Sequence, residues 1–194
     1  MKSNIIFIAM LFFISAKNIY SQAFLDNFAV NPKIGVYYTS NSGIFSGFFG
    51  EYLNGIVGGL ELNTTYKGLI YSIDFHGFGE LSFHNPQEYY RQIGVMAGKR
   101  FGQKLFRIQV QGGLATFWGL RRVGLATSGW LSNSYKSEKF LIPGFVGKVG
   151  FKFIPSRVFS IGIDLQTNLN THNSLLMPML SLEFGNLRPA KEKR

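Results

Sequence analysis

The sequence contains no cysteine, and charged residues make up only 15% of its 194 positions. Without cysteine there is no disulfide framework, no thiolate metal site and no lipoprotein attachment cysteine. Soluble domains carry about 25% charged residues, so this composition does not suit a fully hydrated surface. Long apolar runs are also missing. After residue 22 no stretch reaches the roughly eighteen apolar residues of a membrane helix, so we predict no transmembrane helix there.

The charge that is present is mostly positive, with 20 Lys and Arg against 10 Asp and Glu. Nucleic acid is not the expected partner, because the basic residues form no cluster interleaved with aromatics and no binding motif is present. Metal, nucleotide and phosphate-loop motifs are also absent from the sequence, so we expect no cofactor and no metal. Anionic lipid or lipopolysaccharide at a membrane surface is the counter-charge that we expect.

Residues 1–22 have the features of a secretory signal peptide. Lys2 supplies the charged start, Ile5–Ala16 forms an apolar core, and Ser21 followed by Gln22 provides a cleavage point. The core is too short to span a bilayer comfortably as an anchoring helix. We therefore expect export across the inner membrane.

Beyond the signal peptide, apolar and polar side chains alternate along the chain. The pattern is clearest in Val158–Asn170, which is longer than a usual strand and close to the ~9–11 residues that a tilted strand needs to cross a bilayer. Strict alternation indicates a strand with one apolar and one polar face. Seven further segments show it: Lys33–Ser40, Ile56–Tyr66, Leu69–Leu81, Glu88–Arg100, Phe106–Leu120, Phe140–Ile154 and Leu175–Gly185.

The connections between these segments alternate in length. Tight turns with glycine or proline occur at Lys67-Gly68, Phe101–Lys104 and Pro155–Arg157. The other connections are mostly longer, and the longest is Arg121–Lys139. This asymmetry is typical of outer-membrane barrels, whose short turns lie in the periplasm. We therefore predict an all-β fold over residues 23–185, a transmembrane antiparallel up-and-down β-barrel of about eight strands.

Two alternatives to this barrel are consistent with the same pattern. Asn54-Gly55 is a hairpin signal, so Ile44–Leu53 is a possible extra strand; a partner in Val123–Leu131 would make ten strands. A soluble ligand-binding barrel of the lipocalin type has the same alternation with the faces reversed. The membrane form is favoured because the apolar parity ends in aromatics, as interfacial girdles require. Arg91 and Lys99 are charged residues on that parity, so they should lie near the interfaces.

Residues 33–185 resemble the small outer-membrane β-barrel proteins of Gram-negative bacteria, of the OmpA- and OmpX-like type. The resemblance rests on the signal peptide, the alternation, the turn asymmetry and the final strand Leu180–Phe184, whose terminal aromatic is similar to the signal for the barrel-assembly machinery. It implies a monomer in the outer membrane with a structural or loop-mediated binding role at the cell surface. The chain departs from it by continuing through residues 186–194, which we interpret as a basic periplasmic tail.

If the polar parity faces inward, the lumen contains charges of both signs. Because unpaired buried charge is costly, we expect a paired network that fills the interior; a narrow gated channel is the alternative. The predicted members are Lys33, Glu61, Asp74, His76, Glu80, Arg107, Lys148, Lys152, Asp164 and Glu183.

One triplet resembles a catalytic motif. His172-Asn173-Ser174 is similar to the His-x-Ser pair that an eight-stranded lipid A deacylase uses with a later glutamate, here Glu183. The resemblance implies His172 as base and Ser174 as nucleophile. Leu175 stands where the family has asparagine, however, and such residues are common in turns. We expect no enzyme activity and keep a lipid A-modifying hydrolase as an alternative.

The longest connection is the candidate binding region. Exposed aromatics beside arginine are typical of interfaces, and they suit lipopolysaccharide phosphates or an unknown surface partner. The same residues could instead anchor the barrel rim in anionic lipid. The candidates are Arg121, Arg122, Trp130, Tyr135 and Lys136.

Overall fold

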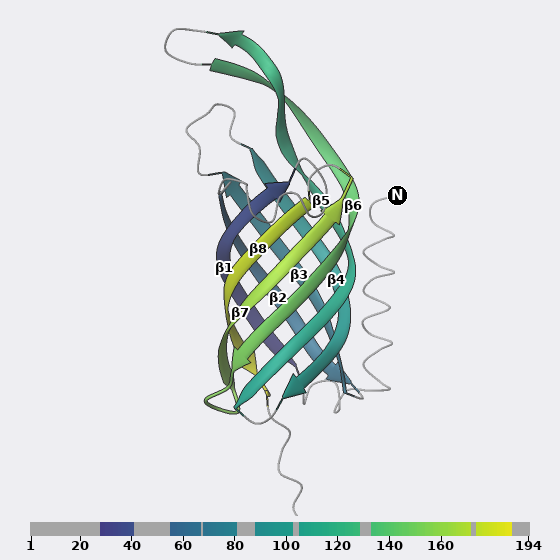
Figure 1. Ribbon diagram of the computed structural model, residues 1–194, viewed down its shortest axis with the longest axis vertical. Coiled ribbons are helices and arrows are strands. Elements are labelled where there is room, and N and C mark those ends of the chain that lie inside the picture. Colours follow the sequence, from purple (N-terminus) through teal and green to yellow (C-terminus); the bar gives the residue numbers. More distant parts are fainter. Residues whose placement is uncertain are drawn as a thin grey trace, which may run out of the picture.

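The computed structural model describes residues 28–40, 55–66, 68–80, 88–102, 105–128, 133–171 and 174–187. Eight antiparallel strands close into one barrel, in which each strand pairs with its sequence neighbours and β1 pairs with β8 (Figure 1). The strands are β1 Ala29–Ser40, β2 Gly55–Tyr66, β3 Leu69–Glu80, β4 Tyr89–Gly102, β5 Phe106–Ser128, β6 Asn133–Phe153, β7 Phe159–Asn170 and β8 Ser174–Gly185. Within these described ranges, no helix is long and apolar enough to cross a membrane.

The predicted eight-stranded barrel is confirmed, and most strand ends agree with the sequence pattern to within a few residues. The ten-stranded alternative is wrong, because Val123–Ser128 continues β5 and pairs with β6 instead of forming a new strand. Ile44–Leu53, the signal peptide and residues 188–194 lie outside the described residues.

Alternation sorts the side chains into an apolar outside and a largely polar inside. In β7, Ile161, Ile163 and Leu165 are 44%, 58% and 41% exposed, whereas Asp164 and Gln166 are completely buried. The other strands repeat this arrangement, with exposed Ile, Leu, Val and Phe on one face. This is the reverse of a soluble lipocalin-type barrel, in which apolar residues face inward.

The two ends of the barrel differ. The turns between β2 and β3, β4 and β5, and β6 and β7 are short, and they lie at the end where β1 begins and β8 ends (Figure 1). In the first of these turns Gly68 has a φ of +79°, in the left-handed region that favours glycine. At the opposite end β5 and β6 continue well beyond the other strands (Figure 1).

This continuation corrects one prediction. The sequence predicts a loop over Arg121–Lys139, but residues 121–128 and 133–139 form paired strands, from Arg121 opposite Glu138 to Ser128 opposite Asn133. We call these residues the β5–β6 ribbon. Two register shifts, next to Arg122 and after Leu125, interrupt its ladder. The ribbon extends beyond the barrel wall, and among its described side chains Val123 and residues 136–139 are exposed. These positions bury no apolar face, so their sequence lacks the apolar alternation that marks the other strands.

Candidate functional site

The inward-facing side chains form a layered interior. Toward the ribbon end they are apolar, and Phe140 and Ile142 pack against this cluster. Its buried members are Tyr37, Val57, Phe78, Tyr90, Phe117, Leu175, Met177 and Met179. From the middle of the barrel toward the short turns, most of the buried side chains are charged or carry amides, and the apolar ones include two small clusters, Met96–Ala115–Val146 and Ala29–Ile154–Leu187. We call the two parts the apolar cluster and the polar network.

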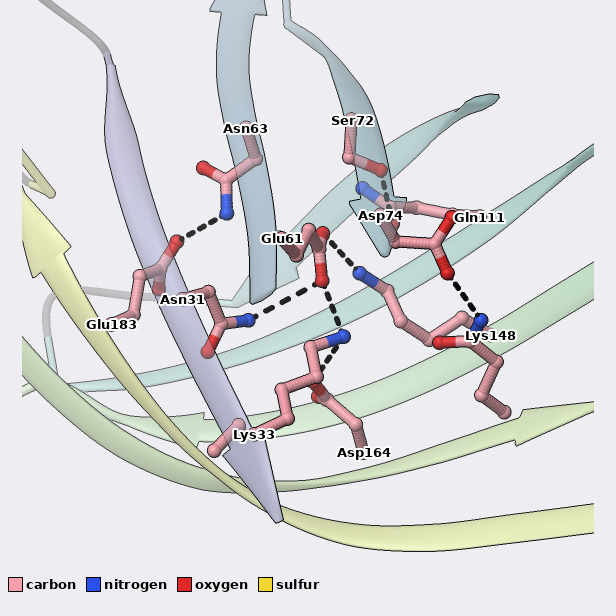
Figure 2. A network of polar contacts seen from close by, with 12 residues as sticks. Asn31, Lys33, Glu61, Asn63, Ser72, Asp74, Gln111, Lys148, Asp164 and Glu183 are labelled. Atoms are coloured by element: carbon pink, nitrogen blue, oxygen red, sulfur yellow. Dashed lines mark hydrogen bonds and ion pairs between the residues drawn. The ribbon is translucent and has the colours of Figure 1, made fainter. Parts of the chain in front are cut away.

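The centre of the polar network is a chain of alternating charges (Figure 2). Glu61 of β2 accepts a hydrogen bond from Lys148 of β6, at 2.5 Å, and forms an ion pair with Lys33 of β1. Lys33 lies 3.0 Å from Asp164 of β7, which also lies 2.8 Å from Lys152. All five side chains are 0% exposed. Each carboxylate therefore contacts two ammonium groups, and the chain links strands from opposite sides of the barrel.

A second part of the network surrounds Asp74 of β3. Its Oδ2 accepts hydrogen bonds from Gln166 at 2.7 Å and Gln92 at 3.2 Å, and it lies 3.0 Å from Nδ1 of His76. Asn168 in turn donates to Oε1 of Gln92 at 2.7 Å. His76 is thus an interior partner of a carboxylate. Among the residues that the structure describes, no group of three or more His, Asp or Glu side chains is arranged to hold a metal.

The third part lies near the short turns and is centred on Glu183 of β8. Its carboxylate forms an ion pair with Arg107 and accepts hydrogen bonds from Asn63 and Ser160, each at 3.0 Å. Arg100 lies 4.0 Å away. Together the three parts include side chains from all eight strands. These contacts connect the strands in addition to the backbone hydrogen bonds between neighbouring strands.

Most of the residues predicted for the lumen are buried inside it: Lys33, Glu61, Asp74, His76, Arg107, Lys148, Lys152, Asp164 and Glu183. Glu80 differs, since it lies partly exposed at the ribbon end of β3, where it accepts a hydrogen bond from the backbone N–H of Glu88. The prediction missed the amides that complete the network and the apolar cluster above it. Both were detectable, because they share the inward parity.

Two of the catalytic candidates, Ser174 and Glu183, lie far apart. His172 lies outside the described residues, and Ser174 is the first residue of β8. Glu183 follows nine residues later in the same strand, about 30 Å away at the rise of an extended chain. It also contacts Arg107 at the opposite end of the barrel. Glu183 is therefore too far from Ser174 to serve as the acid of a catalytic triad.

Four of the five binding candidates belong to the β5–β6 ribbon. Arg121 lies 3.3 Å from Glu138 across the ribbon, and Lys136 is exposed. Arg122 and Tyr135 belong to β5 and β6, but their side chains and the whole of Trp130 lie outside the described part of the structure. Beyond the barrel wall the alternation of β5 and β6 continues. It places Arg121, Lys136 and Glu138 on the face that points inward in the barrel, and Lys139 on the face that points outward.

No protein-family model and no curated protein matches the sequence. Among solved structures, Neisserial surface protein A matches with a TM-score of 0.61 and 13% identity, over 81% of this chain and 96% of that one. Ail, the attachment invasion locus protein of Yersinia pestis, gives 0.57 and 12%, over 81% and 97%. The N-terminal β-barrel domain of Pseudomonas aeruginosa OprF gives 0.55 and 12%, over 81% and 96%. The chain therefore has the fold of the small eight-stranded outer-membrane β-barrels.

Proposed function

We propose that this protein is an outer-membrane β-barrel with a filled interior, and that the barrel is a scaffold for the β5–β6 ribbon, which binds a polyanionic partner at the cell surface. The observation that carries the proposal is the length of β5 and β6. They have 23 and 21 residues, against 12 to 14 in the other strands. Short turns of outer-membrane barrels lie in the periplasm. The ribbon is at the other end, so in the proposed placement it projects outside the cell.

The charge of the ribbon supports an anionic partner. Residues 121–139 contain Arg121, Arg122, Lys136 and Lys139 against the single acid Glu138. Guanidinium and ammonium groups form their strongest hydrogen bonds with sulfate, phosphate and carboxylate oxygens. Ail, a protein of the same fold, has been crystallised in complex with the heparin analogue sucrose octasulfate. A sulfated or phosphorylated glycan is therefore the class of partner that we propose.

We expect sucrose octasulfate to bind the micelle-embedded protein, and the double variant R121Q/K136Q to bind it about tenfold more weakly. Each lost cation removes an exposed contact of roughly 0.7 kcal/mol, so the two losses together amount to about a factor of ten in affinity. Isothermal titration at two salt concentrations measures both the affinity and its electrostatic component. Arg157, exposed in the turn between β6 and β7, supplies the matched control R157Q. Equal loss in R157Q, or no binding by the unaltered protein, would contradict the role of the ribbon.

The filled interior supports a scaffold in place of a channel. An eight-stranded barrel is only just wide enough for its own side chains, and here the central ion pairs are 0% exposed with the apolar cluster above them. We expect planar bilayers containing the purified protein to show no conductance steps. The control is the same preparation tested for a heat-dependent shift in gel mobility, which shows that folded barrels were present. Reproducible single-channel steps would establish the narrow channel instead.

A further inference from the structure

The outer wall of the barrel carries charge of one sign only, within the residues that the structure describes. Its outward-facing charged side chains are Arg91 and Lys99 near opposite ends of β4, and Lys139 where β6 joins the wall. All three are exposed. The carboxylates of the wall strands lie on the inward parity. An anion that approaches the outside of the wall therefore meets cations and no repelling carboxylate.

Arg91 and Lys139 belong to one patch at the ribbon end, formed by two neighbouring rows of cross-strand partners on β4, β5 and β6. The rows are Tyr89–Leu120–Lys139 and Arg91–Trp118–Leu141. Two strand spacings and two residues of rise separate the Cα atoms of Arg91 and Lys139 by about 12 Å. Both side chains are long and project from the same face, so one anionic group can contact both. Tyr89 and Trp118 supply the aromatic rings that occupy membrane interfaces.

An apolar stripe continues from this patch toward the middle of the wall. Further along the same strands, the first row of outward-facing partners in which all three side chains are apolar is Val95–Leu114–Phe145. These side chains are 56%, 58% and 67% exposed. Ile93 and Leu141, 47% and 70% exposed, lie between that row and the cations. A matching ligand therefore has a polar anionic head and apolar chains that run parallel to the strands. A lipid has this shape, whereas a free anion uses only the cations.

We propose that the ribbon ends of β4, β5 and β6 form a binding site for the phosphorylated headgroup of an outer-leaflet lipid, with Arg91 and Lys139 contacting phosphate oxygens. Charge-assisted hydrogen bonds to phosphate supply the specificity, and the Val95–Leu114–Phe145 row contacts the acyl chains. The site rests on the membrane placement of the proposed function, but not on the ribbon's polyanionic partner. It lies on the outer face, opposite to the face that carries Arg121 and Lys136.

Native mass spectrometry of the protein in micelles tests the site with three probes. These are lipid A, a bis-phosphorylated diglucosamine lipid, the same lipid after removal of its phosphates, and inorganic phosphate. We expect lipid A to bind the unaltered protein, and R91Q/K139Q to bind it about tenfold more weakly. The charge-preserving variant R91K/K139R should retain binding. Dephosphorylated lipid should bind as weakly as it does to R91Q/K139Q, and inorganic phosphate should not compete.

Lys99 provides the matched control, because it is an exposed cation on the same strand at the periplasmic end. K99Q should bind lipid A like the unaltered protein. Equal binding by R91Q/K139Q, an equal loss in K99Q, or displacement by inorganic phosphate would overturn the site. Each variant is first checked for the heat-dependent gel shift of a folded barrel. A chain that shows no such shift and binds no lipid refutes the membrane placement itself, and with it the site.

Discussion

Replacing Glu61 with glutamine (E61Q) will lower the free energy of unfolding by about 3 kcal/mol, since it leaves the buried ammonium group of Lys148 without a counter-charge. Glu61 accepts from Lys148 at 2.5 Å, forms an ion pair with Lys33 and accepts from Asn31 at 3.3 Å. Lys33 keeps Asp164 in the variant, at 3.0 Å. Lys148, by contrast, has no second carboxylate within ion-pair distance among the described residues. Urea titration of the micelle-embedded barrel, followed by far-UV circular dichroism, measures the loss.

The double variant E61Q/K148M separates the charge effect from simple loss of packing. Methionine is close in length to lysine and carries no charge. K148M alone therefore removes one of the two ammonium groups that contact Glu61 and leaves Lys33 as the other. When both changes are combined, neither group is left uncompensated, and the cost should be clearly less than the sum of the single costs. Additive costs, or a loss below about 1 kcal/mol for E61Q, would mean that water hydrates these charges inside the barrel.

Alternation predicted the barrel and the orientation of its side chains because both are local properties. Asp164 and Gln166 fall between Ile163 and Leu165 in the sequence, and the pleat of a strand sends neighbours to opposite faces. The local pattern does not predict which charged side chains contact one another inside the barrel. Glu61 and Lys148 are 87 residues apart. Their contact depends on how far the strands are staggered when the sheet closes, and no local pattern encodes that stagger.

The apolar cluster shows a second limit of sequence reasoning. Tyr37, Phe78 and Phe117 lie on the inward parity, yet aromatic residues in such a sequence are also the mark of the interfacial girdles. Composition does not separate the two roles. In the structure Tyr37 meets Phe78 edge to face, with ring centroids 5.4 Å apart, and Phe78 meets Phe117 at 5.9 Å. These rings lie inside the barrel, on the ribbon side of the polar network.

Glu183 illustrates the same limit for the candidate site. In the linear sequence, Glu183 is an acid that follows a His-x-Ser triplet, and this order of residues matches a catalytic pattern. The strand that separates it from Ser174 is fully extended, so the sequence distance of nine residues becomes nearly the full depth of the barrel. Arg107, Asn63 and Ser160 instead make Glu183 part of the interior network. The ribbon was missed for a related reason, because the exposed side chains described on it, Val123 and residues 136–139, leave no apolar period to detect.

Substituting Gly113 with alanine (G113A) will destabilise the barrel by about 2–4 kcal/mol, a large effect for one methyl group. Gly113 faces inward on β5, opposite Met96 of β4. A Cβ at this position would lie 1.9 Å from the backbone oxygen of Val95 and 2.8 Å from the Cα of Met96. Backbone atoms of a closed barrel cannot turn away as a side chain can. The methyl group must therefore push β4 and β5 apart and strain their shared ladder.

Gly112, the residue immediately before, is the matched control. It faces outward, and its nearest neighbour to a Cβ would be the backbone oxygen of Val146 at 3.8 Å, an ordinary contact. G112A should leave stability unchanged or raise it by about 0.5 kcal/mol, because alanine restricts the unfolded chain. Urea midpoints of the two variants in the same micelles give the comparison. If G113A and G112A unfold at the same urea concentration, the close approach of β4 and β5 does not limit the size of the residue at Gly113.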